Sequence, residues 1–298
     1  MTKILDPKND VVFQKIFGMQ KNKHILISFL NSILNLKGDN VIKNVEFEEK
    51  HLDVSMIISE KLSILDLHVS TESNLDINIE IQLLNQYNMI KRTIFYMAKM
   101  LLNQLNKGEN YSLLNRTVTI NILNFDYLKD ENYIKCYNLF EKETKQQLTD
   151  LLEIVFIELP KFIRFGKKEY NKEYNEKLYK WLTFLSNPLG KETEEFMKTD
   201  GEIKEAMDVL YEISGDKETV MLAEMREKAI MDEQSRLKGA REEILKETMI
   251  ENLNEIGEVS QKVIILINKQ QDMAILKYWN KLSARVQSLE EFEDKMKK

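Results

Sequence analysis

The strict alternation of residues 75–84, with the sequence LDINIEIQLL, limits the fold more than any other stretch of the chain. Successive side chains of a β-strand point to opposite faces. The segment therefore predicts a strand with one apolar face and one face of carboxylates and amides, which includes Glu80 and Gln82. This polar face contains no lysine or threonine, the usual residues of a solvated strand face.

Residues 61–70 (KLSILDLHVS) form a second alternating segment, and only residues 71–74 separate the two. This spacing predicts an antiparallel hairpin. If both apolar faces pack on one core, Asp66 projects from the same side as Glu80 and Gln82. Two converging carboxylates can bind Mg²⁺, which prefers a few hard oxygen ligands. The bound metal can then stabilise the negative charge that develops on a phosphate during hydrolysis. A half-exposed sheet with an ordinary polar face is the alternative, and periodicity by itself favours it.

The order of the other elements predicts an α/β protein, with helices packed on a central sheet. Gly18 is expected to break the first helix in two, and Pro160 follows the last strand. The helical patterns cover residues 10–36 and 86–106, and the strand patterns cover residues 41–49, 116–125 and 152–159.

Beyond Pro188 the sequence becomes helical and charged, so we predict a domain at residues 1–188 and a helical, acidic C-terminal extension at residues 189–298. Residues 192–258 carry 20 acidic and 9 basic residues. Their apolar positions do not form sustained heptads. We interpret the extension as a solvated appendage or a surface for homo-oligomer formation; a partner surface or a DNA mimic is the alternative.

Composition narrows the class of protein. The chain is 43% hydrophobic and 31% charged, which is typical of a globular protein with a real core. Cys136 is the only cysteine, which excludes an internal disulfide and a multi-cysteine zinc site. No run of 18 apolar residues and no secretory signal is present, so we expect a cytoplasmic protein without a membrane span.

The charge distribution allows a nucleic-acid partner although the net charge is −6. The residues outside 192–258 carry a net +5, and basic residues gather at 85–116 and 159–182. Local basic patches matter more for phosphate binding than the total charge. Three basic residues of the predicted helix at 86–106 either bind DNA phosphates or form a solvated helix face: Lys91, Arg92 and Lys99.

Several blocks taken together resemble the PD-(D/E)XK nuclease superfamily, and more narrowly its bacterial recombination-promoting nuclease and transposase family. They are DPKNDVVFQKIFG, HILISFLNSIL, LDLHVSTESNLDINIEIQ and KRTIFYMAKMLLNQLNKGENYSLLNRTVTINILNFDYL. The resemblance covers roughly residues 6–165. It implies a restriction-endonuclease-like mixed sheet flanked by helices, and a Mg²⁺-dependent DNA endonuclease in which Mn²⁺ is an alternative metal.

The resemblance also implies roles for individual residues. Asp66 and Glu80 would be metal ligands, with the backbone carbonyl of Ile81 as a third. Gln82 stands where the wider superfamily usually has lysine; the narrower family commonly has this glutamine. A neutral amide can orient a water or a phosphate oxygen but adds no charge. Charge stabilisation would then fall to the metal and to a nearby cation, for which Lys61 and Arg92 are candidates. Lys91 and Arg92 would assist in binding the phosphate, and all three cations are predicted to bind DNA.

Other features leave alternatives open. Relatives tend to have glycine in the turn of the hairpin, where this chain has Asn74, a residue that tolerates turn conformations. His68 tunes the site or is a surface histidine. Asp10 joins the metal cluster or only caps a helix. The whole chain can also be a catalytically inactive nuclease fold that serves as a DNA-binding or protein-interaction module.

Overall fold

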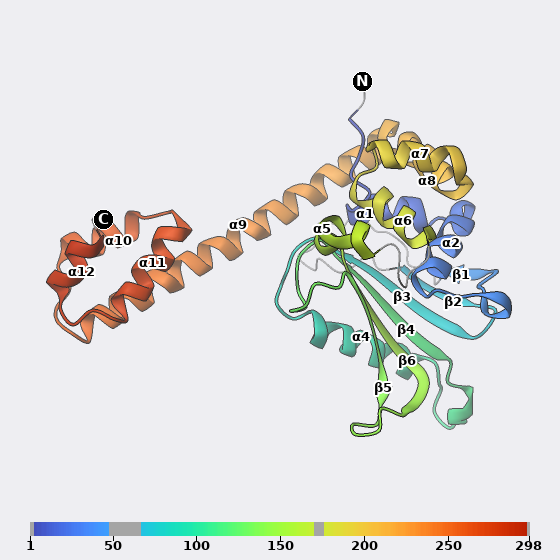
Figure 1. Ribbon diagram of the computed structural model, residues 1–298, viewed down its shortest axis with the longest axis horizontal. Helices are drawn as coiled ribbons and strands as arrows, with labels where there is room; N and C mark the ends of the chain where they lie inside the picture. Colours follow the sequence, from blue (N-terminus) through green and yellow to red (C-terminus); the bar gives the residue numbers. More distant parts are fainter. Residues whose placement is uncertain (1–2, 48–66, 170–175, 297–298) are drawn as a thin grey trace. The chain divides into compact units, whose positions relative to one another are not determined.

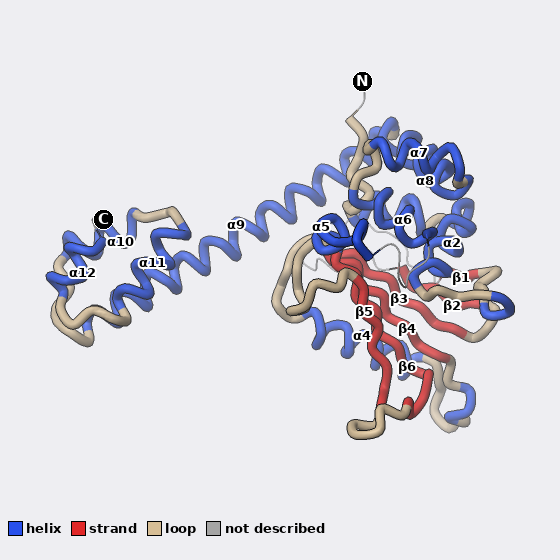
Figure 2. The backbone as a smooth tube through the Cα atoms, in the orientation of Figure 1, coloured by secondary structure: helices blue, strands red, loops and turns tan. Residues whose placement is uncertain are grey.

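The computed structural model describes residues 3–47, 67–169 and 176–296 of the chain (Figures 1 and 2). Contacts divide the chain into two compact units, Met1–Ala229 and Ile230–Lys298. Helix α9 (Lys217–Asn254) contains the division between them. No described helix is both long and apolar enough to cross a membrane.

The described part of the first unit contains a six-stranded mixed sheet in the order β1-β2-β3-β4-β6-β5. The neighbours β3–β4 and β4–β6 are parallel, and the other pairs are antiparallel. The predicted α/β fold is therefore confirmed. The strands are β1 (Val45–Phe47), β2 (Leu67–Thr71), β3 (Leu75–Gln82), β4 (Arg116–Leu123), β5 (Ile134–Phe140) and β6 (Gln147–Glu158).

Helices cover both faces of the sheet, and α4 (Met89–Asn103) lies on the opposite face from α1, α2 and α6 (Figure 1). Because β3 and β4 are parallel, the chain must cross over between them, and α4 is part of this crossover. The helices on the other face pack on the alternate apolar residues of the strands in one large core. The other α-helices that lie wholly in the described part of this unit are α1 (Asp10–Phe17), α2 (Lys23–Ile33), α5 (Leu159–Glu169), α6 (Glu176–Ser186), α7 (Lys191–Thr199) and α8 (Gly201–Gly215).

Aromatic rings fill the centre of this core. Phe17 lies 4.9 Å from Phe29 and 5.6 Å from Trp181 between ring centroids, and all three side chains are buried. The predicted break at Gly18 is present between α1 and α2. A Cβ atom at Gly18 would lie 2.8 Å from the carbonyl oxygen of Gln14 and 2.5 Å from the side chain of Leu67, and the close approach of the Gln14 backbone favours glycine there.

The hairpin of β2 and β3 turns through a left-handed residue, Asn74, with φ of +57°. Asparagine is among the few residues that adopt this conformation readily, which explains why glycine is not needed. Glu72 in the same turn accepts hydrogen bonds from the backbone N–H groups of Lys43 at 2.6 Å and Asn44 at 3.0 Å. The bond from Lys43 is the main reason why the pKa of Glu72 is lowered.

Element bounds differ from the sequence prediction at several points. The predicted helix at 86–106 is observed as Met89–Asn103, and of the predicted strand at 41–49 the described residues form only Val45–Phe47. Residues 61–66 of the predicted hairpin lie outside the described residues. The sequence analysis missed β5, an edge strand whose exposed, irregular pairing with β6 gives no clean alternation.

The N-terminal segment is tied to α8 and to the start of α9. The Leu5 N–H donates to Ser214 Oγ at 3.1 Å, and Asn9 Nδ2 donates to the Ala223 carbonyl at 3.1 Å. Ile203 and Leu210 of α8 are fully buried in the same core as the sheet. The predicted domain boundary near Pro188 therefore falls inside the first compact unit.

The second unit is helical throughout its described residues and has a core of its own. Trp279 and Leu276 pack there with Met249 and Leu253, which belong to the last turns of α9. Together with the end of α9 it contains α10 (Gln261–Lys269), α11 (Met273–Ser283) and α12 (Leu289–Met296).

Asp200 offers a test of electrostatic stabilisation in the first unit. Its carboxylate caps α8 by accepting a hydrogen bond from Ile203 N–H at 3.3 Å, and it pairs with Lys177. Burial raises the pKa of Asp200, but Lys177 and the cap outweigh burial, so its pKa is lowered below 3.8.

We expect Asp200→Asn to lower the free energy of unfolding by about 1 kcal/mol at pH 7, because asparagine keeps the cap and loses the charge. A carboxyl group whose folded-state pKa is lowered stabilises the fold above its unfolded-state pKa and loses this effect as the pH falls through the folded-state pKa. Urea unfolding at pH 7 and at decreasing pH below 3.8 measures both effects. A difference between the two proteins that grows in acid would contradict this explanation.

Candidate active site

The carboxylate of Glu80 is buried between the sheet and α4. Glu80 belongs to β3, where alternation sends Ile79 and Ile81 into the large core and Glu80 to the opposite face. Its side chain is 3% exposed. In the parallel register Glu80 lies opposite Asn121 of β4. The strand thus holds an acid where burial disfavours its charge.

Arg92 of α4 supplies the opposite charge. Its guanidinium forms an ion pair and a hydrogen bond with Glu80 Oε1, and the Arg92 side chain is 11% exposed. The guanidinium also lies 5.8 Å from the centroid of the Tyr96 ring, one helical turn further along α4. Burial raises the pKa of Glu80 although the charge and hydrogen bond of Arg92 act in the opposite direction.

A second polar contact fixes α4 over this part of the sheet. Thr93 Oγ1 donates to Asn121 Oδ1 at 2.8 Å, and Asn121 Nδ2 donates to the Val155 carbonyl at 3.2 Å. The sequence analysis did not single out Thr93 or Asn121. The signal for Asn121 was present, because Thr117, Thr119 and Asn121 alternate with apolar residues in RTVTINIL.

Gln82 lies on the same face of β3 as Glu80, two residues further on, and is 5% exposed. Its Nε2 donates to the Leu84 carbonyl at 3.2 Å. The predicted polar face of this strand is therefore present and is mostly buried. Ile81 stands between the two polar residues and packs its side chain into the core.

Asp66 and Lys61 lie outside the described residues. The described hairpin begins at Leu67, which pairs with Ile79, and His68 pairs with Asn78. His68 is half-buried on the polar face of the sheet.

Asp10 forms a contact elsewhere in the first unit. Its Oδ2 accepts a hydrogen bond from Arg226 Nε at 2.6 Å, and both residues are buried. Asn9 is the N-cap of α1, and its Oδ1 accepts the Val11 N–H at 3.1 Å. Asp10 is the first residue of the helix, and its Oδ1 accepts the same N–H at 3.0 Å.

The predicted phosphate-binding cations differ in their surroundings. Lys91 and Lys99 are on the exposed side of α4, whereas Arg92 faces Glu80. Ile94, Phe95 and Leu102 are also exposed on α4, at 53%, 66% and 77%.

The basic window at 159–182 is partly neutralised by pairs within the protein. Lys161 is buried and donates to Glu158 Oε2 at 2.7 Å, and Arg164 binds both carboxylate oxygens of Asp126 at 2.8 Å. Glu158 also accepts the Leu128 N–H at 3.1 Å. These cations therefore serve the fold around the end of β6.

Within the described ranges, no three histidine, cysteine, aspartate or glutamate side chains gather as a metal site. The described residues fit a hard cation in donor chemistry, because the Glu80 carboxylate and the Gln82 amide offer oxygen atoms on one strand face. The predicted second carboxylate, Asp66, lies outside the described ranges.

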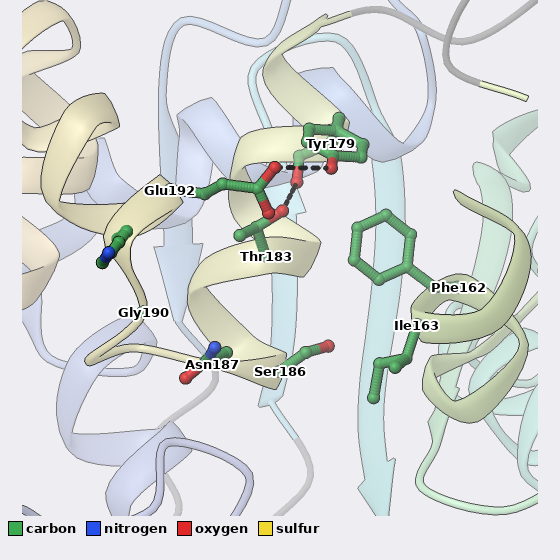
Figure 3. Close-up of a pocket in the computed structure, with 9 residues that line it drawn as sticks. Phe162, Ile163, Tyr179, Thr183, Ser186, Asn187, Gly190 and Glu192 are labelled. Carbon is green, nitrogen blue, oxygen red and sulfur yellow. Dashed lines mark hydrogen bonds between the residues drawn. The ribbon is translucent and has the colours of Figure 1, made fainter. Parts of the chain in front are cut away.

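A cavity of about 360 Å³ lies between α5, α6 and the start of α7 (Figure 3). Phe162 and Tyr179 line it, and the Tyr179 hydroxyl donates to Glu192 Oε1 at 3.5 Å. It contains none of the residues that the sequence analysis assigned to metal or DNA.

A mixed sheet with flanking helices and a buried acid on a central strand defines the class of the protein as a PD-(D/E)XK-like α/β fold. The chain belongs to the PD-(D/E)XK nuclease family transposases, whose family model matches residues 7–240. The family resemblance seen in the sequence is thus confirmed. No curated protein and no solved structure matched the chain.

Proposed function

We propose that the protein is a Mg²⁺-dependent DNA endonuclease, with Mn²⁺ as an alternative metal. The observation that carries this proposal is the buried Glu80 carboxylate on the polar face of a central strand in a chain of a nuclease family. An acid whose pKa is raised by burial and opposed by one specific charged partner is typical of functional sites, so the position of Glu80 favours a functional role.

Asp66 and Glu80 would hold the metal, with the backbone carbonyl of Ile81 as a third ligand. The described hairpin supports this proposal, because Leu67, the first residue of β2, pairs with Ile79, the residue before Glu80. When bound, the metal supplies Lewis acidity and positive charge beside the phosphate.

Gln82 would orient a water or a phosphate oxygen through its amide, since it lies next to Glu80 on the strand face. Lys61, Lys91 and Arg92 would bind phosphates of the DNA. Lys91 is exposed on α4, near Arg92 in sequence, which suits contact with a polyanion. We expect the protein to act in the cytoplasm and its C-terminal helices to support self-association.

A second candidate function is a nuclease fold that binds DNA or a protein partner without cutting. The observation that favours it is the ion pair of Glu80 with Arg92, which occupies the carboxylate that a metal needs.

Purified protein incubated with DNA separates the two candidates. An endonuclease should cut in Mg²⁺ or Mn²⁺, stop cutting in EDTA, and lose cleavage in the Asp66→Ala variant. Retention of DNA in a binding assay without cleavage in either metal would support the binding module. Equal cleavage by wild type and Asp66→Ala would point to a contaminating nuclease.

A further inference from the structure

Arg92 is the cation that balances Glu80 in the described structure. Both side chains are largely buried, at 11% and 3% exposure, so neither charge is well solvated. A buried carboxylate without a partner is strongly unfavourable. A divalent metal at Glu80 would therefore compete with a cation that is already bound to the same carboxylate.

The same geometry limits what can move. Thr93, the next residue of α4, is hydrogen-bonded to Asn121 of the sheet at 2.8 Å, which holds the helix backbone in place. The Arg92 side chain is held by fewer contacts than its hydrogen-bonding capacity allows. Its buried Nε has no hydrogen-bond partner among the described residues, and the Tyr96 ring offers the guanidinium a second contact.

We propose that Arg92 is a positioning residue that exchanges partners: it holds Glu80 when no metal is bound, and it moves to a phosphate of the DNA when a divalent cation takes the carboxylate. This inference rests on the proposed function of the Glu80 site. The exchange leaves no buried charge alone at either stage. Before it, Arg92 balances Glu80; after it, the metal does so and a phosphate accepts the guanidinium, which suits bidentate contact with phosphate.

The exchange has a thermodynamic consequence. Metal binding without DNA must displace Arg92 from its only described anionic partner, whereas DNA offers Arg92 a new one. Metal and DNA should therefore bind cooperatively, and each should raise the affinity for the other by the same factor. Arg92 would be the source of this coupling.

The test measures Mn²⁺ affinity by isothermal titration calorimetry, without DNA and with a short duplex whose phosphodiesters are replaced by phosphorothioates, which are hydrolysed more slowly; gel analysis after the titration checks that the duplex is intact. Arg92→Gln should bind Mn²⁺ at least about tenfold more tightly than wild type without DNA, because the competitor is gone; tenfold corresponds to about 1.4 kcal/mol. The presence of DNA should tighten Mn²⁺ binding in wild type and change it little in Arg92→Gln. Lys107→Gln is the matched control, since it removes an exposed cation just beyond the end of the same helix and should leave Mn²⁺ affinity within twofold of wild type.

An unchanged or weaker Mn²⁺ affinity in folded Arg92→Gln would overturn the exchange, as would the absence of measurable Mn²⁺ binding in both proteins. Should Arg92→Gln fail to fold, Arg92→Lys keeps the charge and loses the planar fork, and its Mn²⁺ affinity should exceed that of wild type by a smaller factor. An equal affinity there would also overturn the proposal. DNA cleavage by the wild-type protein is measured separately. If the wild type cleaves DNA but Arg92→Gln does not bind Mn²⁺ more tightly, only the proposed exchange is refuted. If Arg92→Gln binds Mn²⁺ more tightly but the wild type does not cleave DNA, only the proposed nuclease activity is refuted.

Discussion

Glu80→Gln is expected to lower the rate of metal-dependent DNA cleavage at least about 1,000-fold, which corresponds to about 4 kcal/mol of transition-state stabilisation. The amide has nearly the shape of the carboxylate but no charge, so it is a poor ligand for a hard cation. Its oxygen can still accept the hydrogen bond from Arg92 that Glu80 accepts, so the fold should persist. Single-turnover cleavage with protein in excess over DNA measures the loss without interference from product release.

The control for this variant is Glu131→Gln, which removes the same charge from an exposed position. It should cleave at the wild-type rate. DNA binding in EDTA, followed by fluorescence anisotropy, should be retained by Glu80→Gln, because phosphate contacts do not require the carboxylate. A Glu80→Gln protein with wild-type cleavage would show that this carboxylate does not hold the metal.

Arg226→Ala is expected to lower the free energy of unfolding of the first unit by about 3–5 kcal/mol, the usual cost of removing one partner from a buried ion pair. Arg226 and Asp10 are 5% and 7% exposed, and the pair joins α9 to α1. The variant leaves the Asp10 carboxylate buried without its cation. Replacing both residues, as in Asp10→Asn with Arg226→Met, should recover much of the loss, because no uncompensated charge remains.

The two tryptophans make this measurement specific to one unit. Trp181 is buried in the core of the first unit and Trp279 in the core of the second. In a Trp279→Phe background, fluorescence during urea unfolding reports on the first unit alone. Arg164→Ala is the control, since Arg164 pairs with Asp126 on the exposed surface of the same unit and should contribute less than about 1 kcal/mol. Equal effects of the two arginine variants would contradict the stated role of the buried pair.

The alternation of residues 75–82 predicted correctly which side chains of β3 enter the core, because strand geometry assigns faces from sequence alone. It could not predict what covers the polar face. The partner of Glu80 comes from α4, twelve residues later, and depends on how the crossover helix lies on the sheet. Periodicity placed Arg92 on a helix and basic composition suggested DNA, but neither indicates a buried contact with a particular acid.

Contacts between distant parts of the chain could not be predicted from the sequence either, because they depend on how the elements pack against one another. Asp10 and Arg226 are 216 residues apart, and nothing in the local pattern of either segment indicates the other. The change to charged helices after Pro188 suggested a boundary there. In the structure, Ile203 and Leu210 of α8 are buried in the same core as the sheet, so this helix belongs to the first unit. Composition alone does not show such packing.

The attachment of the N-terminal segment to α8 and α9 has a consequence for synthesis on the ribosome. Leu5, Asn9 and Asp10 find their partners only at residues 214, 223 and 226. Non-local contacts of this kind slow folding, and a nascent chain that lacks its last partners keeps apolar surface uncovered. We therefore expect the sheet to stay incompletely packed until more than 226 residues have left the exit tunnel, so that translation arrested earlier yields a fragment prone to aggregation and degradation.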